Sequence, residues 1–389
     1  MVPKTYPEAM ELARDLYEDL SFDYVTQWKK QGTDRRVIGF LPIYVPREII
    51  HAAGMLPVGI FGGGERVSVV KGDAFFQSYI CHLPRTVIEM ALDGNFKDFD
   101  GFLFPSICDV IRNLSGVFRL HFPQSFVFYL DFPQNLDPST GGQFYRRQLE
   151  LLAKHLEKLN GRRVTIDRLN RAIRVYNENR RLVKRLSDFR AQVPHRISAV
   201  DHYLVLRAGY IMSVEDHNDF LTRVLSILEK VDREPEDKIR VVISGSFCEQ
   251  PPLGLIKTIE NAGCYVVDDD FQLGSRSITG ALADDTDDPL GVLVETYLKA
   301  GTVSSAIYDG DRPKEDAFAR QVQNRDAQGV IFCAPSFCDP ALLDRPRLEE
   351  AMDRHHIRHF SFQYHENLGQ FHVIKEQAGT FADMIKLWE

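Results

Sequence analysis

The sequence lacks the features that would place this protein in a membrane or on nucleic acid. No apolar run approaches the roughly 18 residues that a membrane-spanning helix needs. The first 31 residues have neither the basic lead nor the apolar core of a signal peptide. The net charge of −8 argues against nucleic acid as a general partner. We therefore expect a cytoplasmic protein that binds neither membranes nor nucleic acid.

Two nucleotide-binding motifs are also absent. The segment 245–270 has the strand–loop–helix–strand pattern of a dinucleotide-binding unit, but it lacks the G-x-G-x-x-G spacing that lets a backbone approach pyrophosphate. The run Gly254-Leu-Ile-Lys-Thr258 lacks the adjacent Gly-Lys of a phosphate loop. If the activity of this protein depends on ATP, we expect another chain to bind it.

Cysteine is scarce, and a cytoplasmic setting argues against a disulfide framework for the six that are present. Two of them lie near the end of similar sequence segments, Gly101-Phe-Leu-Phe-Pro-Ser-Ile-Cys108-Asp109 and Gly329-Val-Ile-Phe-Cys-Ala-Pro-Ser-Phe-Cys338-Asp339. The apolar run predicts a buried strand, and Pro-Ser predicts the turn that ends it. We therefore expect each cysteine at the carboxyl end of a strand, just before a helix.

This position favours chemistry at the sulfur. Ligands bind at the carboxyl edge of open α/β sheets, and a helix N-terminus stabilises a thiolate. Cys81 begins a helical pattern and so shares that environment. Thiolates favour iron–sulfur clusters or zinc, and Cys81, Cys108 and Cys338 are too far apart for a short zinc motif. Two interpretations stay open: a cubane cluster on three cysteines with one open iron, or three buried structural cysteines.

The remaining cysteines give weaker signals. Cys264 opens an apolar strand and Cys333 lies within one, so both are expected to be small core residues. Cys248 follows a strand and is a lesser candidate for the same cleft.

Strand and helix signals alternate in the first and last thirds of the chain, whereas the middle is helical. This pattern predicts an α/β protein with two Rossmann- or flavodoxin-like parallel-sheet domains joined by a helical segment. The expected boundaries are 1–141 for the N-terminal α/β domain with two cluster cysteines, 142–236 for the helical segment and 237–389 for the C-terminal α/β domain with the third. The expected strands are Val37–Leu41, Pro57–Phe61, 101–105, Phe126–Leu130, Ile239–Ser244, Tyr265–Val267, 330–333 and His359–Gln363.

A basic stretch lies inside the helical segment. From Gly161 to Arg196 it has eleven basic residues against three acidic ones. Either it is a solvated helix face, or it docks a phosphorylated ligand tail or an acidic partner protein.

Three residues are candidate proton donors for a closed cleft: Tyr44, Glu249 and His365. His365 is singled out from the histidines near the end of the chain because it follows a strand-like run at the expected sheet edge.

Several of these segments together resemble a known family, the 2-hydroxyacyl-CoA dehydratases and benzoyl-CoA reductases. The text from Val37 to Val58 is similar to its opening strand–Pro-Glu-helix–Ala-Gly–Pro-Val segment, and Tyr176-Asn-Glu-Asn-Arg180 resembles its mid-chain helix signature. Cys81, Cys108 and Cys338 fall at its three cluster-binding positions. The likeness covers nearly the whole chain and is greatest to the smaller catalytic subunits of the ATP-dependent reductases.

The resemblance implies a [4Fe–4S] cluster on those three cysteines and a paralogous catalytic partner subunit. It also implies a separate ATP-hydrolysing activator that delivers single electrons from reduced ferredoxin. The implied reaction is the two-electron reduction of the ring of benzoyl-CoA to cyclohexa-1,5-diene-1-carbonyl-CoA, in anaerobic catabolism of aromatic compounds.

Two alternatives remain beside that function. One is a subunit of a 2-hydroxyacyl-CoA dehydratase, although the closing run from Gly369-Gln370 lacks the arginine-rich text common in those enzymes. The other is a non-catalytic iron–sulfur subunit that relays electrons to its partner.

Overall fold

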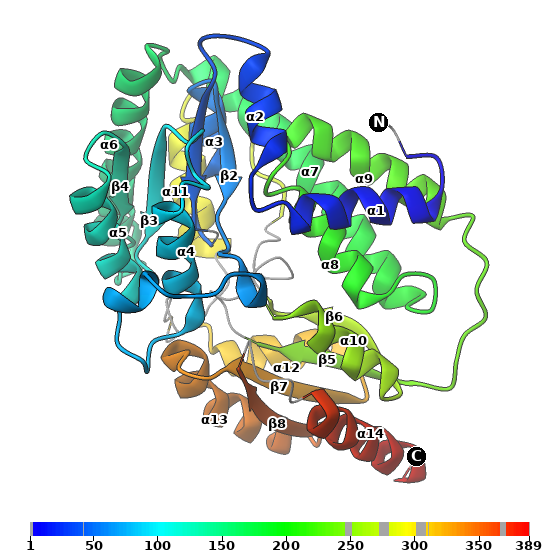
Figure 1. Cartoon of the computed structure of the whole chain (residues 1–389). Helices are drawn as coiled ribbons and strands as arrows, with labels where there is room; N and C mark the ends of the chain where they lie inside the picture. Colours follow the sequence, from blue (N-terminus) through cyan, green and yellow to red (C-terminus); the bar gives the residue numbers. More distant parts are fainter. Residues whose placement is uncertain are drawn as a thin grey trace.

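Two four-stranded parallel sheets organise the chain (Figure 1). The computed structural model describes residues 3–41, 43–245, 251–271, 280–300, 309, 311–365 and 371–388. The first sheet has the strand order β2-β1-β3-β4 and the second has the order β6-β5-β7-β8. The two orders are the same when β5 to β8 are matched to β1 to β4. The expected α/β fold with two Rossmann- or flavodoxin-like sheets is confirmed.

The strands form where apolar runs are bounded by polar residues or turns. Strands β2, β3 and β7 are buried along their whole length, as expected for parallel strands covered on both faces. Most expected strands lie within a residue or two of the observed ones. The bounds are β1 Arg36–Phe40, β2 Met55–Gly59, β3 Gly101–Pro105, β4 Phe126–Leu130, β5 Ile239–Ser244, β6 Cys264–Asp269, β7 Gly329–Pro335 and β8 Arg358–Tyr364.

Helices cover both sheets and form a layer between them. In Figure 1, α4, α5 and α6 lie beside the first sheet, and α10, α12, α13 and α14 lie beside the second. Their bounds are α3 Arg47–Ala52, α4 His82–Leu92, α5 Asp109–His121, α6 Gln143–Asn160, α10 Leu253–Asn261, α12 Lys314–Asn324, α13 Asp339–Arg354 and α14 Phe371–Trp388. Among the described helices, none combines the length and apolar character that crossing a bilayer requires.

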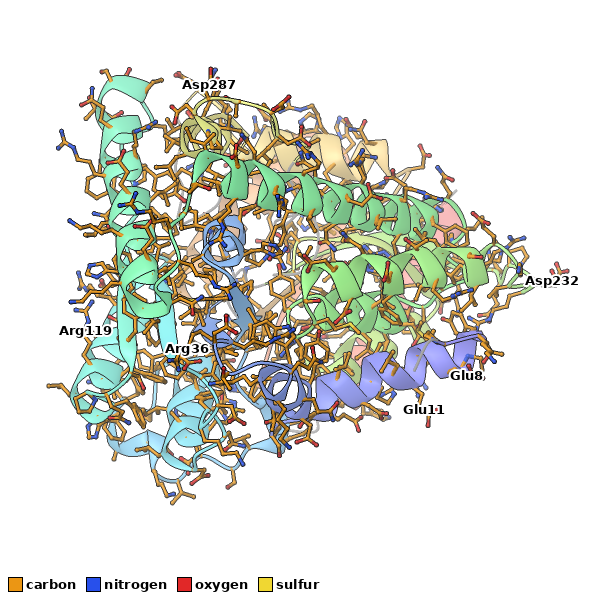
Figure 2. The ribbon with its side chains drawn as sticks, turned by 90° about the horizontal axis from the view of Figure 1, so that it is seen from above. Glu8, Glu11, Arg36, Arg119, Asp232 and Asp287 are labelled. Atoms are coloured by element: carbon orange, nitrogen blue, oxygen red, sulfur yellow. The ribbon has the colours of Figure 1, made fainter. Side chains whose placement is uncertain are left out.

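The middle of the chain forms the helical layer seen from above in Figure 2. Its helices are α7 Ile166–Gln192, α8 Ala199–Ala208 and α9 Val214–Leu228, and the N-terminal helices α1 Tyr6–Glu18 and α2 Asp23–Lys30 lie nearby. Helix α1 packs on α8 and α9, and its Glu8 and Glu11 point away from the layer in Figure 2. Helix α11 (Pro289–Ala300) packs on α6 and α7, so a segment from the last third of the chain returns to the first sheet.

Many basic side chains of the stretch 161–196 form ion pairs within the chain. Arg180 pairs with the buried Glu48 of α3, and Lys184 pairs with Asp188 within α7. Arg162, Arg174, Arg181 and Arg185 also have carboxylate partners within 4.0 Å. Apart from Arg180 and Arg190, the described basic side chains with ion pairs are exposed, which agrees with a solvated helix face. Docking of a phosphorylated ligand tail or an acidic partner protein stays a prediction.

The helix signature that begins at Tyr176 is structural. The buried Asn177 side chain donates to the carbonyl of Leu282 over 2.7 Å and accepts from its N–H over 2.8 Å. Asn177 thereby fixes the segment that leads into α11. Tyr176 is buried beneath the guanidinium of Arg47 at 5.0 Å. These residues join α7 to α3 and to the chain before α11.

A buried ion network joins α7 to the second sheet. Arg190 is only 2% exposed. Its Nη1 donates a hydrogen bond to Asp269 over 2.8 Å, and its Nη2 lies 3.5 Å from Asp268. Arg325 donates to Asp268 over 2.7 Å and to Asp188 over 3.0 Å. The carboxylates at the end of β6 thus have cationic partners from both α7 and the residue that follows α12.

A buried histidine in this layer is held neutral. His217 Nε2 donates to the carbonyl of Val205 over 3.0 Å, and Nδ1 accepts from the amide of Asn179 over 2.9 Å. Burial lowers the pKa of His217 to about 4, although the Val205 carbonyl acts in the opposite direction. A proton on Nδ1 would remove the acceptor that Asn179 uses.

We expect the protein to lose stability as the pH falls from 6.5 toward 4. The folded-state pKa of His217 lies below the unfolded value of 6.5. The stability that the neutral His217 contributes is therefore fully present above pH 6.5, and it is lost as the pH falls to the folded-state pKa. A pKa near 4 corresponds to about 3 kcal/mol. Denaturant unfolding across this range should show a shallower loss for His217→Gln than for wild type. An identical pH profile in both proteins would show that His217 is not the group that causes the loss. His202 is a second buried histidine with a lowered pKa, so His202→Gln serves as the comparison.

Candidate active site

The two repeated cysteine loops occupy equivalent positions in the two sheets. After β3, the N–H of Ser106 donates to the carbonyl of Leu130 at the end of β4 over 2.9 Å. After β7, the N–H of Ser336 donates to the carbonyl of Tyr364 at the end of β8 over 2.8 Å. The Pro-Ser turn therefore extends the sheet pairing by one residue before each cysteine.

Each of the three candidate cysteines is the N-cap residue of a helix. Cys81 precedes α4, Cys108 precedes α5 and Cys338 precedes α13. Cys81 and Cys338 are buried, and Cys108 is partly exposed. A helix N-terminus presents unpaired N–H groups and partial positive charge, both of which stabilise an anionic sulfur. The sequence-based expectation that these residues precede helices is confirmed.

Cys338 is close enough to Cys108 to act on its charge. Burial raises the pKa of the Cys108 thiol, the N–H groups of Ile111 and Val110 lower it, and the nearby Cys338 raises it again. Two sulfurs from loops far apart in the sequence therefore share one electrostatic environment. Cys108 follows β3 and Cys338 follows β7.

Cys81 lies at the same edge of the first sheet by topology. Helix α4 leads into β3, so it runs back along the sheet, and its N-terminus lies at the edge where the parallel strands end. Among the described residues, no three His, Cys, Asp or Glu side chains lie close enough to hold a single metal ion. A cubane is several ångströms across, and its cysteines lie farther apart than the ligands of one ion. The observation that favours a cluster at this site is therefore the position of the three cysteine sulfurs at helix N-termini.

Tyr44 lies in a strained turn after β1. Ile43 and Tyr44 have φ values of 101° and 57°, which are unfavourable for residues with a branched or bulky side chain. Strained backbone of this kind is often found at functional sites. The Tyr44 ring packs edge-on against Phe132 and Tyr297, with centroids 5.7 and 5.9 Å away. The turn thus directs Tyr44 into an aromatic group at the edge of the first sheet.

This aromatic group was not expected from the sequence. It joins Tyr44 to Phe132 after β4, Tyr145 on α6 and Tyr297 on α11. Burial raises the pKa of Tyr145 and of Tyr297 far above the ordinary tyrosine value. The Tyr297 hydroxyl is buried and has no hydrogen-bond partner among the described residues. No local spacing signals this group, because its members come from four separate elements.

His365 is connected to the second cysteine loop. Its Nε2 lies 3.0 Å from the hydroxyl of Ser336, and its ring packs against exposed Phe337, which has a φ of 69°. Glu249 and Cys248 lie outside the described residues, as do Gly369 and Gln370.

The expected core cysteines are confirmed as core. Cys264 is 0% exposed and Cys333 is 1% exposed. Burial raises the pKa of the Cys264 thiol to about 12 and that of Cys333 still further. Both sulfurs are therefore inert thiols inside the second sheet.

The chain is similar to known proteins along nearly its whole length. The family described as 2-hydroxyglutaryl-CoA dehydratase, D-component, matches residues 42–385. A benzoyl-CoA reductase subunit of Thauera aromatica is 49% identical over 96% of this chain and 97% of its own length. The beta subunit of (R)-2-hydroxyglutaryl-CoA dehydratase of Acidaminococcus fermentans is 28% identical over 93% of this chain and 95% of its own length. The (R)-phenyllactyl-CoA dehydratase beta subunit of Clostridium sporogenes is 25% identical over the same shares.

Proposed function

This chain belongs to the 2-hydroxyglutaryl-CoA dehydratase D-component family, and we propose that it is the smaller catalytic subunit of an ATP-dependent benzoyl-CoA reductase. The observation that carries the proposal is the 49% identity to a benzoyl-CoA reductase subunit, against 28% and 25% to two dehydratase beta subunits. The proposed reaction adds two electrons and two protons to the ring of benzoyl-CoA and forms cyclohexa-1,5-diene-1-carbonyl-CoA.

We propose that Cys81, Cys108 and Cys338 hold a [4Fe–4S] cluster. The supporting observations are the position of all three sulfurs at helix N-termini and the effect of Cys338 on the charge of Cys108, which requires the two loops to be near one another. When bound, such a cluster supplies single electrons at low potential. The N–H groups of Val110 and Ile111 would stabilise negative charge on the Cys108 sulfur.

The other proposed roles concern protons and water. A ring that has accepted an electron must be protonated before the electron returns, so a positioned acid and a dry cleft are both needed. Tyr44 is a candidate because its strained turn directs it into an aromatic group that excludes water. His365 is a second candidate because it bonds to the loop that carries Cys338. Glu249 remains a third from its place in the sequence.

The proposed assembly has further members. We propose a paralogous catalytic subunit and a separate ATP-hydrolysing activator, with reduced ferredoxin as the electron donor. The sequence motifs for ATP binding are missing from this chain, which supports a nucleotide site on another subunit.

We expect the oxygen-free complex to consume benzoyl-CoA when ATP and a one-electron reductant are supplied. Product analysis by mass spectrometry should show a cyclic dienoyl thioester two mass units above the substrate. The matched control is the same complex with a 2-hydroxyacyl-CoA thioester. Conversion of that thioester to an enoyl-CoA, with benzoyl-CoA unchanged, would reject the reductase and favour the dehydratase. Turnover that persists when the three cysteines of this chain are replaced would exclude both a catalytic and an electron-relay role for its cluster and would favour a scaffold role.

A further inference from the structure

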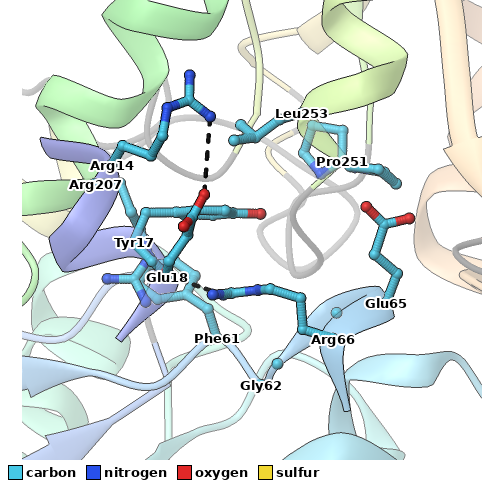
Figure 3. Close-up of a pocket in the computed structure, with 13 residues that line it drawn as sticks. Arg14, Tyr17, Glu18, Phe61, Gly62, Glu65, Arg66, Arg207, Pro251 and Leu253 are labelled. Carbon is cyan, nitrogen blue, oxygen red and sulfur yellow. Dashed lines mark hydrogen bonds and ion pairs between the residues drawn. The ribbon is translucent and has the colours of Figure 1, made fainter. Parts of the chain in front are cut away.

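A cavity lies between the loop that follows β2 of the first sheet and the chain that leads into α10 after β5 of the second. Its volume is about 230 Å³, and it is lined by α1, the loop after β2, Arg207 of α8 and the chain at the start of α10 (Figure 3). The glycine-rich loop and the helix start thus come from different sheets. None of the residues that line this cavity was given a role in the function proposed above.

Arg207 is a buried cation with no carboxylate partner in the described part of the chain. Its side chain is 5% exposed, and its guanidinium lies 3.9 Å above the ring of Phe61. Atoms Nε and Nη1 have no hydrogen-bond partner among the described residues. Burial lowers the pKa of Arg207 to about 10, because desolvation disfavours the charged form. An arginine buried without a carboxylate is costly, so a bound anion would supply the partner that the described residues do not provide.

The backbone on one side of the cavity has an anion-binding conformation. Gly62 and Gly64 have φ values of 69° and 53°, and Gly63 between them has φ −106° and ψ 0°. Alternation of left- and right-handed residues forms a nest, in which successive N–H groups converge on one point. A Cβ on Gly62 would lie 2.2 Å from Thr86 Oγ1, and one on Gly63 would lie 2.0 Å from Val67 Cγ2. This conformation therefore requires glycine.

The opposite side of the cavity is the start of a helix. Pro251, Pro252 and Leu253 line it, and Pro252 is the N-cap of the nine-residue helix α10. No side chain of a described residue caps this helix. The N–H of Leu255 donates to the Pro252 carbonyl over 2.9 Å, so the N–H groups of Leu253 and Gly254 and the partial positive charge of the helix start are what it offers to a ligand. The nest and the helix N-terminus both favour binding of an anion.

The remaining charges set the preference for anions. Arg66 is held by its Nη2 bond to the carbonyl of Tyr17 over 2.8 Å. Arg14 lies 3.9 Å from Glu18, and both side chains are about half exposed. Glu65 is the second carboxylate of the lining. Three arginines thus face two carboxylates, and only Arg14 is paired with one of them among the described residues.

We propose that this cavity is a phosphate-binding site that takes a phosphoryl or pyrophosphate group on Arg207, Arg66 and the nest at Gly62–Gly64. A phosphate offers several acceptor oxygens and up to two charges, which suits converging N–H groups together with two guanidinium groups. This proposal does not rest on the function proposed above. Its test measures binding of the phosphate compound and needs no turnover.

The test is calorimetric titration of the full chain with inorganic pyrophosphate at constant ionic strength. We expect one site per chain and at least about tenfold weaker binding by Arg66→Met. Arg207→Met should abolish the pyrophosphate-dependent rise in melting temperature. It should leave the melting temperature of the ligand-free chain unchanged or higher, since it removes a buried charge that has no carboxylate partner among the described residues. If Arg207 had only a structural role, Arg207→Met would lower the melting temperature of the ligand-free chain.

Arg185→Met is the matched control, because that side chain is exposed on α7, has only a 3.9 Å ion pair and is not part of the cavity lining. It should bind pyrophosphate as wild type does. Displacement of pyrophosphate by coenzyme A would identify an acyl-CoA as the source of the phosphate, and failure to displace it would identify a free phosphate compound. No binding by wild type, or equal binding by wild type and both cavity variants, would overturn the proposal.

Discussion

Replacing Cys108 or Cys338 by serine is expected to remove most of the iron from this chain and all turnover of benzoyl-CoA by its complex. The proposed cubane would lose one of its three thiolate ligands in each variant, and a serine hydroxyl is a poor ligand for iron–sulfur clusters. Serine is also a favoured N-cap, so α5 and α13 should still begin where they do. Iron loss would therefore not result from a lost helix start.

Iron and acid-labile sulfide, measured on oxygen-free protein, check this prediction. Cys264→Ser provides the control, because Cys264 is fully buried at the start of β6 and belongs to the core. That variant should keep its iron and its activity while losing some stability. Full iron and full activity in Cys108→Ser or Cys338→Ser would refute the assignment of the cluster ligands.

Replacing Arg190 by methionine is expected to lower the free energy of unfolding by about 3–5 kcal/mol. The guanidinium is 2% exposed and is the hydrogen-bonded partner of Asp269. Methionine fills much of the same space but leaves that carboxylate buried without this cation. Denaturant unfolding measures the loss. Arg185→Met, on the exposed face of the same helix, should change stability by less than about 0.5 kcal/mol.

The loss should depend on pH in a defined direction. Burial raises the pKa of Asp269, and Arg190 lowers it, so removing Arg190 raises it further. A carboxyl whose folded-state pKa exceeds its unfolded value costs stability once the pH passes the unfolded value, near about 4. The gap between variant and wild type should therefore widen above that pH. Adding Asp269→Asn should recover part of it; a double variant no more stable than the single one would show that the charge is not the cause.

The strands and the cysteine positions could be predicted because local signals determine them. Gly101–Pro105 and Phe126–Leu130 are short apolar runs bounded by polar residues, and their observed bounds match the prediction. The repeated Pro-Ser-X-Cys-Asp text predicted N-cap positions for Cys108 and Cys338, because turn chemistry acts over a few residues.

Other features could not be predicted, because they depend on elements far apart in the sequence. The pairing of Arg190 with Asp269 spans 79 positions, and the Arg180–Glu48 pair spans 132. Charge composition alone left the basic stretch as an exposed face or a docking surface. The tri-glycine run at Gly62–Gly64 was visible, but the sequence did not indicate that Arg207 lies buried beside it.

The sequence by itself determined the class of fold, the family and the three sulfurs at helix starts, since these follow from local periodicity, turn residues and similarity along the chain. Only the tertiary structure decided which charges are buried in pairs, which arginine lacks a carboxylate among the described residues and which aromatic rings surround Tyr44. Burial and electrostatic partners depend on what packs nearby in space, and parallel sheets bring distant segments to one edge.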